Sequence, residues 1–530
     1  MESSAHQEAA RGGPQCSAGR EGREPAPNVS VNLSRSFRMS GHRSLIVFTL
    51  FTAEAVLLAI LFLPATLGFA AWAYSDQGAN LTAQYLVARG YQPAIDFGYP
   101  YGLLPLLVAH IWFWLFAATP QACFGITAIC AVLIACAFAR IVLALNVELA
   151  GIMLLLITLP LTIPFYPPNL THICEALLLT NALADHAARR YSRALALIAA
   201  CLFVKPSMGF LYGFLLVLMI ICKLMKEKRL SLRNIVRIVA PALLTTAVVS
   251  AVLALSYGSL SLVESLLPFA GMHTYAAQNF GFFRAGRALW NPLHPTVGYY
   301  LKTPAGFWIV ASLWLVACGI AAAKKAFSRG SISHEVVLCC ALLHIGFVAL
   351  FFGNRMSWVY YAYILTIGVA ITSRWSPFFR NSVCALALLA VVGQTANASI
   401  FKLMWKATSP DRETAGLWAS KATIADWHHL VETVSDVRRK GGSASFLEGD
   451  GCAELLLPGL NPPVSLYLYR GEAAESDVSR KLQQLSQSAM IAVLTRTLTE
   501  GLLPNEPEFR RILSRYRLIW KGEAIEIYER

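Results

Sequence analysis

The chain has 530 residues, of which 56% are hydrophobic and 14% carry a charge, and its mean hydropathy is +0.54. These values exclude an ordinary soluble globular protein and predict a polytopic α-helical membrane protein. The formal net charge of +14 arises entirely before residue 402. From that residue on, the chain has 17 basic residues (Lys and Arg together) and 17 acidic residues (Asp and Glu together). Basic loops between apolar segments mark the cytoplasmic side of a membrane, so the excess requires no nucleic-acid partner.

Residues 1–43 are rich in Gly, Ser, Pro, Glu and Arg and lack a periodic apolar pattern, so we expect a disordered cytoplasmic tail. The apolar run from 44 to about 73 is too long for a cleavable signal peptide and predicts the first membrane helix. Further apolar segments follow at 103–118, 121–145, 149–165, 170–185, 191–204, 206–222, 235–257, 305–323, 334–352, 357–373 and 381–401.

Three basic loops, at 223–237, 324–334 and 374–380, orient these segments. They place residues 258–304, and everything after about 401, outside the cytoplasm. Counting forward from a cytoplasmic N-terminus also places the loop 74–102 outside. The number of crossings counted forward from the N-terminus and the number counted back from the basic loops nevertheless differ by one, and the difference arises between 149 and 222. We therefore expect about 11 crossings of a bacterial inner (plasma) membrane, with 170–185 or 191–204 as the segment that fails to span.

The composition changes to that of a soluble protein from about residue 402. Short β-rich runs alternate there with helical patterns; the runs are SASFLEG, VSLYLYR, AMIAVLTRT, RLIWKG and AIEIYER, and the helical patterns are SDVSRKLQQLSQ and EPEFRRILSRY. The sequence thus predicts three parts: the tail 1–43, a transmembrane region over 44–401, and a small extracytoplasmic α/β domain over 402–530.

The cysteines give no sign of a disulfide framework or a metal site. Ten of the 12 lie in apolar runs, where they are expected to pack as small core residues. Residues 402–530 contain one cysteine, Cys452, which excludes a disulfide within that region. No Cys or His spacing indicates zinc, and we expect no structural metal.

Two aspartates, Asp76 and Asp96, lie in the first external loop, although residues 45–401 contain only nine acidic residues in all. They could be ordinary solvated loop acids. However, Asp76 directly follows the first membrane helix, LTAQYLVARGY predicts an amphipathic helix on the membrane plane, and YQPAIDFGYPYGLLP runs straight into the next apolar segment. We therefore expect both carboxylates near the membrane surface, at the depth of a lipid headgroup.

The order of a first membrane helix, an external loop with Asp76 and the segment GYQPAIDFGYPYGLLP (90–105) resembles the GT-C membrane glycosyltransferases. The resemblance is to their bacterial branch related to protein O-mannosyltransferases and aminoarabinose transferases, glycosyltransferase family 39-like. LFVKPSMG (202–209) and FFGNRMSWVYYAY (351–363) are also similar to motifs of this family, and the resemblance in outline covers most of 44–401. Many relatives carry two adjacent acids at the first position, whereas here Gln77 follows Asp76.

The resemblance implies transfer of a sugar from a polyprenyl-phosphate donor in the membrane lipid to an extracytoplasmic acceptor hydroxyl. The acceptor could be a cell-envelope glycan such as lipopolysaccharide, a lipid or a protein. The acceptor oxygen must lose a proton, and Asp76 is the expected general base. Asp96 could orient the acceptor, support the loop or bind a divalent cation beside Asp76, and the two roles could be exchanged. Tyr99 and Tyr101 could stack on a sugar or belong to an interfacial aromatic belt.

The departing phosphate of such a donor needs positive charge rather than a proton donor. Lys205, in the break between two short apolar segments, is the first candidate, and its alternative role is snorkelling from a helix end. Arg355 is the second, and it could instead anchor the chain at the interface. Arg284 and Arg287 in the loop 258–304 could clamp the lipid phosphate or lie on an amphipathic surface helix.

One further polar pair lies in an apolar segment. His172 and Glu175 stand one helical turn apart in NLTHICEA. This spacing could build a polar site, but we favour a satisfied buried pair.

Two other classes of function compete with the glycosyltransferase. A transporter or flippase of lipid-linked saccharides would also be polytopic and basic on the inside, but such proteins usually have two related halves, and this chain has no evident similarity between its halves. A non-catalytic membrane assembly protein would work through residues 402–530, where no catalytic constellation is evident.

Overall fold

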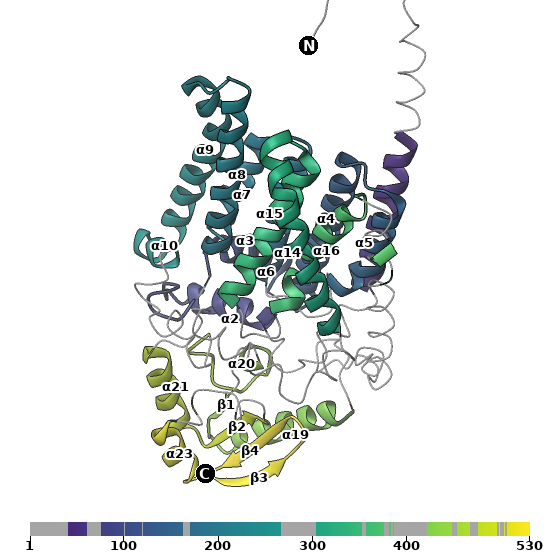
Figure 1. The fold of residues 1–530 in the computed structure, drawn as a ribbon. Helices are drawn as coiled ribbons and strands as arrows, with labels where there is room; N and C mark the ends of the chain where they lie inside the picture. Colours follow the sequence, from purple (N-terminus) through teal and green to yellow (C-terminus); the bar gives the residue numbers. More distant parts are fainter. Residues whose placement is uncertain are drawn as a thin grey trace, which may run out of the picture. The chain divides into compact units, whose positions relative to one another are not determined.

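A computed structural model of the chain describes residues 41–60, 76–99, 101–118, 120–162, 170–266, 304–351, 357–375, 381–382, 385, 421–447, 453–466, 475–495, 498, 503 and 506–530 (Figure 1). The expected tail falls outside these residues except for 41–43, which already belong to the first helix, Gly41–Ile60. The expected boundary at 401 and 402 also lies outside the described part, so the proposed division into domains stays a prediction.

Helices dominate the chain up to residue 372, as the apolar segments predicted. Their bounds after the first helix are α2 Asp76–Ala88, α3 Leu104–Phe116, α4 Pro120–Ala144, α5 Leu149–Thr162, α6 Leu170–Ala187, α7 Tyr191–Leu202, α8 Pro206–Lys226, α9 Leu232–Tyr257, α10 Ser259–Leu266, α14 Pro304–Arg329, α15 Ile332–Phe351 and α16 Ser357–Thr372.

Five of the described helices are long and apolar enough to cross a membrane; they are Gly41–Ile60, Gly125–Ala144, Pro206–Lys226, Leu232–Tyr257 and Ala311–Ser328. Helix α9 illustrates why water cannot surround them. It leaves Leu243, Leu244 and Leu255 exposed, the last by 88%, and buries little more than Leu253 and Tyr257. A helix that is apolar on its exposed faces requires lipid around it, so the chain is an integral membrane protein.

One end of the helical bundle gathers the basic turns. Lys223 of α8 donates to the Tyr191 hydroxyl at 3.0 Å, and Tyr191 and His186 each approach Glu335 of α15 at 3.5 Å. The turns between α8 and α9 and between α14 and α15 therefore lie together (Figure 1). Arg374, in the third basic loop, donates to the carbonyl of Leu145 at the end of α4. We call this the basic end of the bundle.

Helices α6 and α7 run antiparallel to each other between the basic end and the opposite end. Asp185, in the last turn of α6, pairs with Arg140 near the end of α4, and α7 begins nearby at Tyr191. The other end of α7 reaches Lys205, which faces Glu175 near the start of α6. Neither helix is among the five that are long and apolar enough to cross a membrane, so the expectation that 170–185 or 191–204 fails to span stays a prediction.

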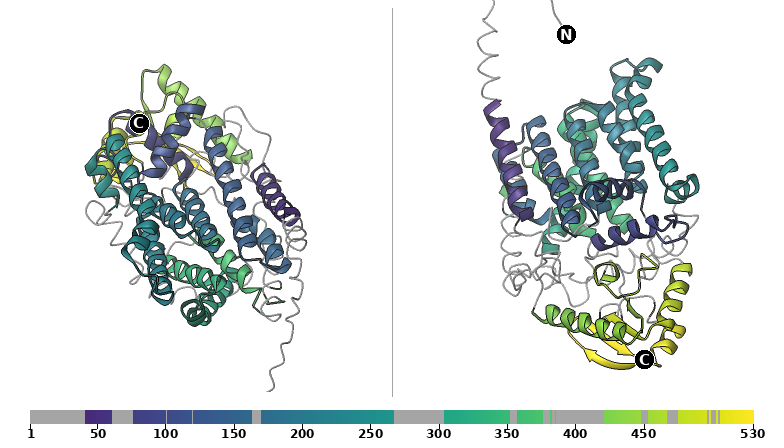
Figure 2. Two further views of the ribbon diagram at one scale, coloured as in Figure 1. Left: turned by 90° about the horizontal axis from the view of Figure 1, so that it is seen from above. Right: turned by 180° about the vertical axis from the view of Figure 1, so that it is seen from behind.

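Helix α3 does not run between the two ends. Leu104, at its start, donates to the carbonyl of Phe203 at the end of α7, and Trp112 donates to the carbonyl of Ala122 at the start of α4. The end of α7 and the start of α4 lie at the same end of the bundle, opposite the basic end. Helices α2 and α3 accordingly lie across the long helices (Figure 2, right). The number of 11 crossings stays a prediction, because most of 381–401 lies outside the described residues.

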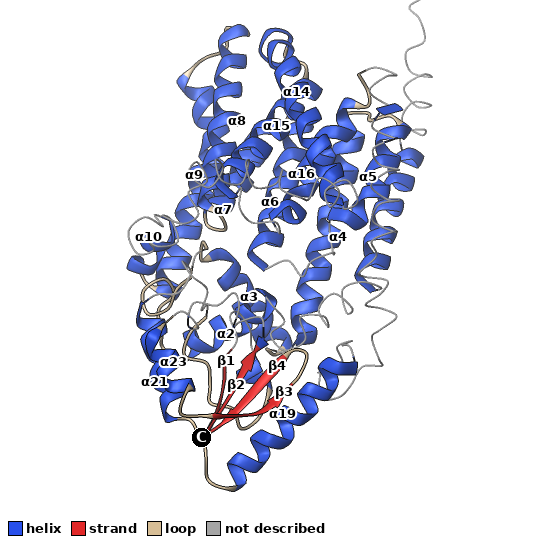
Figure 3. Ribbon diagram, turned by 60° about the horizontal axis from the view of Figure 1, so that its bottom comes forward, coloured by secondary structure: helices blue, strands red, loops and turns tan. Residues whose placement is uncertain are grey.

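The C-terminal region forms an α/β structure, as its sequence predicted. Its elements are α19 Lys421–Arg439, β1 Ala444–Leu447, α20 Ala453–Leu456, α21 Glu475–Gln487, β2 Met490–Leu494, α23 Pro507–Leu513, β3 Arg517–Lys521 and β4 Ile525–Glu529. The strands form one sheet in the order β1-β2-β4-β3, in which β1 and β2 are parallel and the other pairs antiparallel (Figure 3).

Alternate residues of the central strand β2 enter two separate cores. Met490 and Ala492 pack with Trp427 and Leu430 of α19 on one face of the sheet. Ile491 and Val493 pack with residues of α21 and α23 on the other face. The predicted strand VSLYLYR is not formed over its described residues 464–466, because Leu466 instead joins a core with residues of α2 and the first loop.

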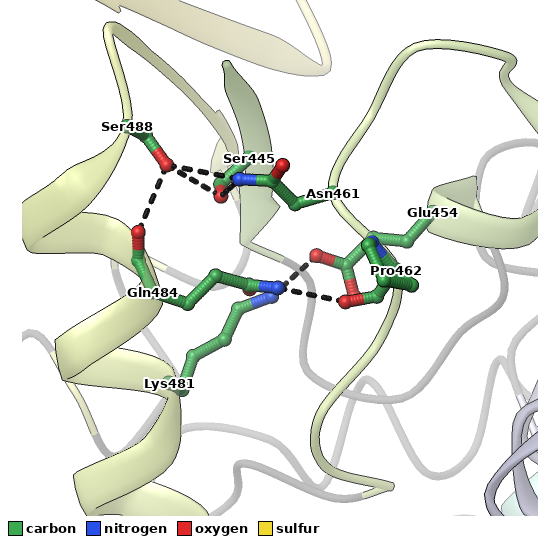
Figure 4. A network of polar contacts seen from close by, with 7 residues as sticks. All are labelled: Ser445, Glu454, Asn461, Pro462, Lys481, Gln484 and Ser488. Atoms are coloured by element: carbon green, nitrogen blue, oxygen red, sulfur yellow. Dashed lines mark hydrogen bonds and ion pairs between the residues drawn. The ribbon is translucent and has the colours of Figure 1, made fainter. Parts of the chain in front are cut away.

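Polar contacts fix α21 within this region (Figure 4). Asn461 donates to Ser445 at 2.9 Å, Ser445 and Ser488 share a hydrogen bond of 2.7 Å, and Gln484 of α21 donates to the carbonyl of Pro462 at 2.7 Å. Lys481 of α21 forms an ion pair with Glu454 of α20, and both side chains are buried.

The pair of Glu454 and Lys481 gives a stability prediction with a pH dependence. Burial raises the pKa of the Glu454 carboxyl even with the lysine beside it, so the folded chain binds this proton more tightly than the unfolded chain. The contribution of Glu454 to stability is therefore greatest at low pH and is lost as the pH rises from the unfolded pKa through the raised folded pKa.

We expect Lys481→Met to destabilise the C-terminal region by about 3 kcal/mol near pH 8, because it leaves a buried carboxylate without its cation. The loss should be smaller at about pH 5 than near pH 8, because protonation of Glu454 removes the unpaired buried charge. Urea titration of the proteolytic resistance of residues 421–530, in the full-length chain, measures both values. Lys481→Met combined with Glu454→Gln is the control and should recover most of the stability; an equal loss at both pH values would contradict the prediction.

Candidate functional site

The first loop, as the structure forms it, comprises residues 89–103 between α2 and α3, and its second residue is a glycine. Gly90 adopts φ +88°, and the N–H of Tyr91 donates back to the carbonyl of Leu86 at 3.1 Å, which is the hydrogen bond that closes a glycine-terminated helix. The chain then turns at once towards Gln92 and Pro93. Glycine at 90 is required because other residues rarely adopt a left-handed backbone.

Asp96 closes the next turn with its own side chain. Its carboxylate accepts the N–H of Gln92 at 2.6 Å, and its N–H donates to the carbonyl of Gln92 at 2.8 Å. The carboxylate is thus engaged within the loop, as in the turns that aspartate commonly stabilises. Of the roles weighed for Asp96, this geometry favours support of the loop.

Aromatic rings connect this turn to α6. Phe97 and Tyr99 meet edge to face with ring centroids 6.4 Å apart, Tyr99 and Tyr101 at 5.9 Å, and Tyr101 and His172 at 5.6 Å. Each pair has the geometry that stabilises aromatic contacts. We call these four residues the aromatic ladder. Tyr99 is buried and Tyr101 half-buried, so neither lies in an exposed interfacial belt.

The end of the loop packs directly on the turn between α7 and α8. The N–H of Gly102 donates to the carbonyl of Val204 at 3.1 Å. A Cβ on Gly102 would lie 2.1 Å from the carbonyl oxygen of Phe203, so this close approach of two backbones requires glycine. The two motifs GYPYG and LFVKPSMG, more than a hundred residues apart in the sequence, therefore form one structural unit.

Lys205 lies at the start of α8. It is the N-cap residue, Pro206 follows at the first helical position, and the Lys205 N–H donates to the carbonyl of Cys201 at 2.9 Å. Its side chain is only 7% exposed, and its Nζ lies 3.7 Å from Oε2 of Glu175, which is fully buried. The same carboxylate oxygen lies 3.7 Å from Nδ1 of His172. We call Lys205, Glu175 and His172 the polar cluster.

The polar cluster has a charge arrangement that suits an anion. A buried lysine at a helix N-terminus adds its charge to the partial positive charge of the free N–H groups, an arrangement that favours phosphate. Glu175 opposes that charge and would have to release the lysine in part when an anion binds. His172 contacts both the carboxylate and Tyr101, so the cluster and the aromatic ladder share it.

Helix α2 confirms the helix predicted for LTAQYLVARGY. Asn80, Thr82 and Gln84 are buried by protein, and the position of the helix on the membrane plane stays a prediction. Gln84 donates to the carbonyl of Leu106 at 2.8 Å and contacts His110 at 3.1 Å, which pairs α2 with α3. Asp76 is the first residue of α2.

The remaining predicted residues cannot be assigned from the structure. Arg284, Arg287 and Arg355 lie outside the described residues, as does the side chain of Asp76. Among the residues that the structure does describe, no group of three or more His, Cys, Asp and Glu side chains could hold a metal ion. A divalent cation at Asp76 and Asp96 therefore stays a prediction.

The pairing of Lys205 with Glu175 is the feature that sequence reasoning missed. The sequence singles out both residues, but in separate segments and with separate roles. A signal was present, because an acidic residue inside an apolar helix requires a partner and Lys205 is the cation in the next break of the chain.

The fold and the polar cluster define a class: an integral membrane protein with a buried charged site at the end of its bundle opposite the basic turns. No protein-family model matches the chain, and no curated protein matches it. The crystal structure of ArnT from Cupriavidus metallidurans bound to undecaprenyl phosphate is similar to it, with 12% identity and a TM-score of 0.49 over 91% of this chain and 97% of that chain.

The crystal structure of the same ArnT in the apo state is also similar, with 11% identity and a TM-score of 0.34 over 94% of this chain and 98% of that chain. At these identities, and with both TM-scores below 0.5, the likeness establishes neither a family nor an activity for this chain.

The contact at Gly102 can be tested directly. We expect Gly102→Ala to separate the loop from the turn between α7 and α8, because the backbone of Phe203 cannot yield to a Cβ at 2.1 Å. The thermal midpoint of the chain in detergent should fall by several degrees, roughly the effect of 1–3 kcal/mol of overpacking. Gly213→Ala in α8 is the control, because its Cβ would meet only Ile198 at 3.4 Å. Equal midpoints for the two variants would refute the proposed backbone contact.

Proposed function

We propose that the chain is an integral membrane glycosyltransferase that moves a sugar from a polyprenyl-phosphate donor to an extracytoplasmic acceptor hydroxyl. One observation supports this proposal more strongly than any other. A buried lysine, placed at a helix N-terminus and balanced by Glu175, lies at the end of the bundle opposite the basic turns. The donor class comes from the resemblance of the loop and lysine motifs to the GT-C glycosyltransferases.

The proposed orientation follows from charge. The basic turns mark the cytoplasmic end, so the polar cluster and the first loop lie towards the outside of a bacterial inner membrane. A polyprenyl chain lies in the lipid and places its phosphate near the headgroup depth. The acceptor is an envelope glycan, a lipid or a protein on the outer side, and the C-terminal α/β region faces the same side.

Each residue then has a distinct role in the transfer. Lys205 and the N-terminus of α8 bind the donor phosphate and stabilise its charge as the sugar departs. Glu175 holds the lysine in place before the donor arrives. Asp76, at the start of α2, takes the proton of the acceptor hydroxyl. Asp96 supports the loop, half-buried Tyr101 lines the approach of the sugar, and buried Tyr99 packs against the Tyr101 ring.

The assignment of Lys205 predicts an effect on donor use. Lys205→Met should raise the donor KM by at least about tenfold, because it removes a charged contact to phosphate worth roughly 1.5–3 kcal/mol. Combining it with Glu175→Gln avoids an unpaired buried carboxylate and separates binding from folding. Lys223→Met is a matched control, since Lys223 lies at the opposite end of the same helix, at the basic end. An unchanged donor KM in the double variant would remove Lys205 from donor binding.

The assignment of Asp76 predicts an effect on the chemical step. Asp76→Asn should lower the rate of sugar transfer by about 10²-fold or more, because general-base catalysis contributes this much, while expression and membrane insertion stay normal. The assay uses membranes with polyprenyl-phosphate-linked sugars and follows the mass of surface glycans. Transfer near the wild-type rate would exclude Asp76 as the base.

A further inference from the structure

Helix α21 of the C-terminal region contacts the first loop through hydrogen bonds. Asp477 is fully buried, and its Oδ2 accepts the N–H of Gly98 at 2.9 Å. Arg480, one turn later, donates to the carbonyl of Asp96 and to Oδ1 of Asp477, the latter at 2.6 Å. The guanidinium of Arg480 also lies over the ring of Tyr91, with 5.2 Å between Cζ and the ring centroid.

These contacts have the features of a specific attachment. The aspartate bonds two partners with its two oxygens, and the guanidinium joins carboxylate, carbonyl and ring, a combination that a lysine could not reproduce. Leu466 of the C-terminal region adds apolar contact, because it is buried in the same core as Phe97 and Tyr99.

Helix α21 is itself held firmly, so it can act as a fixed support. The helix forms the buried ion pair of Lys481 with Glu454, and the hydrogen bond of Gln484 to Pro462 fixes its next turn (Figure 4). Asp477 and Arg480 lie on the preceding turn of the same helix. The loop is thus attached to a rigid element rather than to another loop.

The attached backbone leads straight into the aromatic ladder. Gly98 lies between Phe97 and Tyr99, and the ladder continues through Tyr101 to His172 of the polar cluster. The loop is bonded at its other end through Gly102 to the turn that carries Lys205. Two attachments, one from the C-terminal region and one from the membrane region, therefore fix the backbone on both sides of Tyr99 and Tyr101.

We infer that Asp477 and Arg480 are positioning residues that hold Tyr99 and Tyr101 in register with the polar cluster, which makes the C-terminal α/β region part of the working site. The catalytic meaning of this inference rests on the proposed function. The attachment itself does not, so the two can be tested separately.

Hydrogen exchange measures the attachment without any assay of activity. In the full-length chain in detergent, Arg480→Ala and Asp477→Ala should each accelerate exchange in peptides that cover 91–104 by at least about tenfold, because a charge-assisted hydrogen bond to Gly98 or Asp96 is lost. Asp477→Asn retains an acceptor and should give an intermediate rate. Exchange of β1 and β2 should stay unchanged, which shows that the C-terminal region remains folded.

Arg511→Ala is the matched control for Arg480→Ala. Arg511 also forms an ion pair with an acid three residues earlier, Glu508 at 3.7 Å, but both side chains are exposed. This variant should leave exchange of 91–104 at the wild-type rate. Unchanged exchange in both Arg480→Ala and Asp477→Ala would overturn the attachment, whatever the activity of the chain.

Transfer kinetics test the positioning role. Arg480→Ala should lower kcat for sugar transfer by at least about tenfold while the donor KM changes by less than about twofold, because the lysine that binds phosphate is untouched and only the geometry of the loop is lost. Faster exchange with normal kcat would overturn positioning and leave a purely structural contact. Absence of transfer in the wild-type chain would instead refute the proposed function, and the exchange result would still decide the attachment.

Discussion

The buried pair of Lys205 and Glu175 is the constraint on which the membrane region depends. Two opposite charges in a low-dielectric interior are tolerated only together, since either one alone would cost several kcal/mol. The pair therefore fixes the distance between α6 and the turn from α7 to α8. The first loop contacts this turn through Gly102 and reaches His172 of α6 through Tyr101.

The first loop owes its shape to contacts from three directions. Its own aspartate closes the turn at Asp96, the membrane region binds it at Gly102, and α21 binds it at Gly98. A segment with so few intrinsic constraints would otherwise sample many conformations at a substantial entropic cost. Contacts from several elements explain how a loop can carry aromatic side chains with defined positions, and they give α21 of the C-terminal region a part in fixing the loop.

Much of the fold could be predicted from the sequence, because long apolar runs and alternating strands carry their own signal. The runs SASFLEG, AMIAVLTRT, RLIWKG and AIEIYER each contain a strand. VSLYLYR has the same propensity, but its described residues 464–466 form no strand and Leu466 packs with residues of the first loop, a case in which context overrides propensity. Helix α3 could not be distinguished from a crossing, because only its contacts at both ends reveal its course. The sequence identifies Lys205 as a candidate. Its ion pair with Glu175 cannot be predicted in the same way, because it depends on the packing of α6 against the turn between α7 and α8.

The polar contacts at the two ends of α6, α7 and α8 limit how this part of the bundle can move. One end is held by the ion pair of Lys205 and Glu175. The other end is held by Glu335, which contacts Tyr191 and His186, and by Lys223, which donates to Tyr191. Sliding one of these helices by a single residue, about 1.5 Å, would strain the contacts at both ends at once. Shear among the three helices is thereby disfavoured. Under the proposed function, a long lipid donor would then enter and leave past elements outside this trio, such as α9, whose Leu243, Leu244 and Leu255 are exposed.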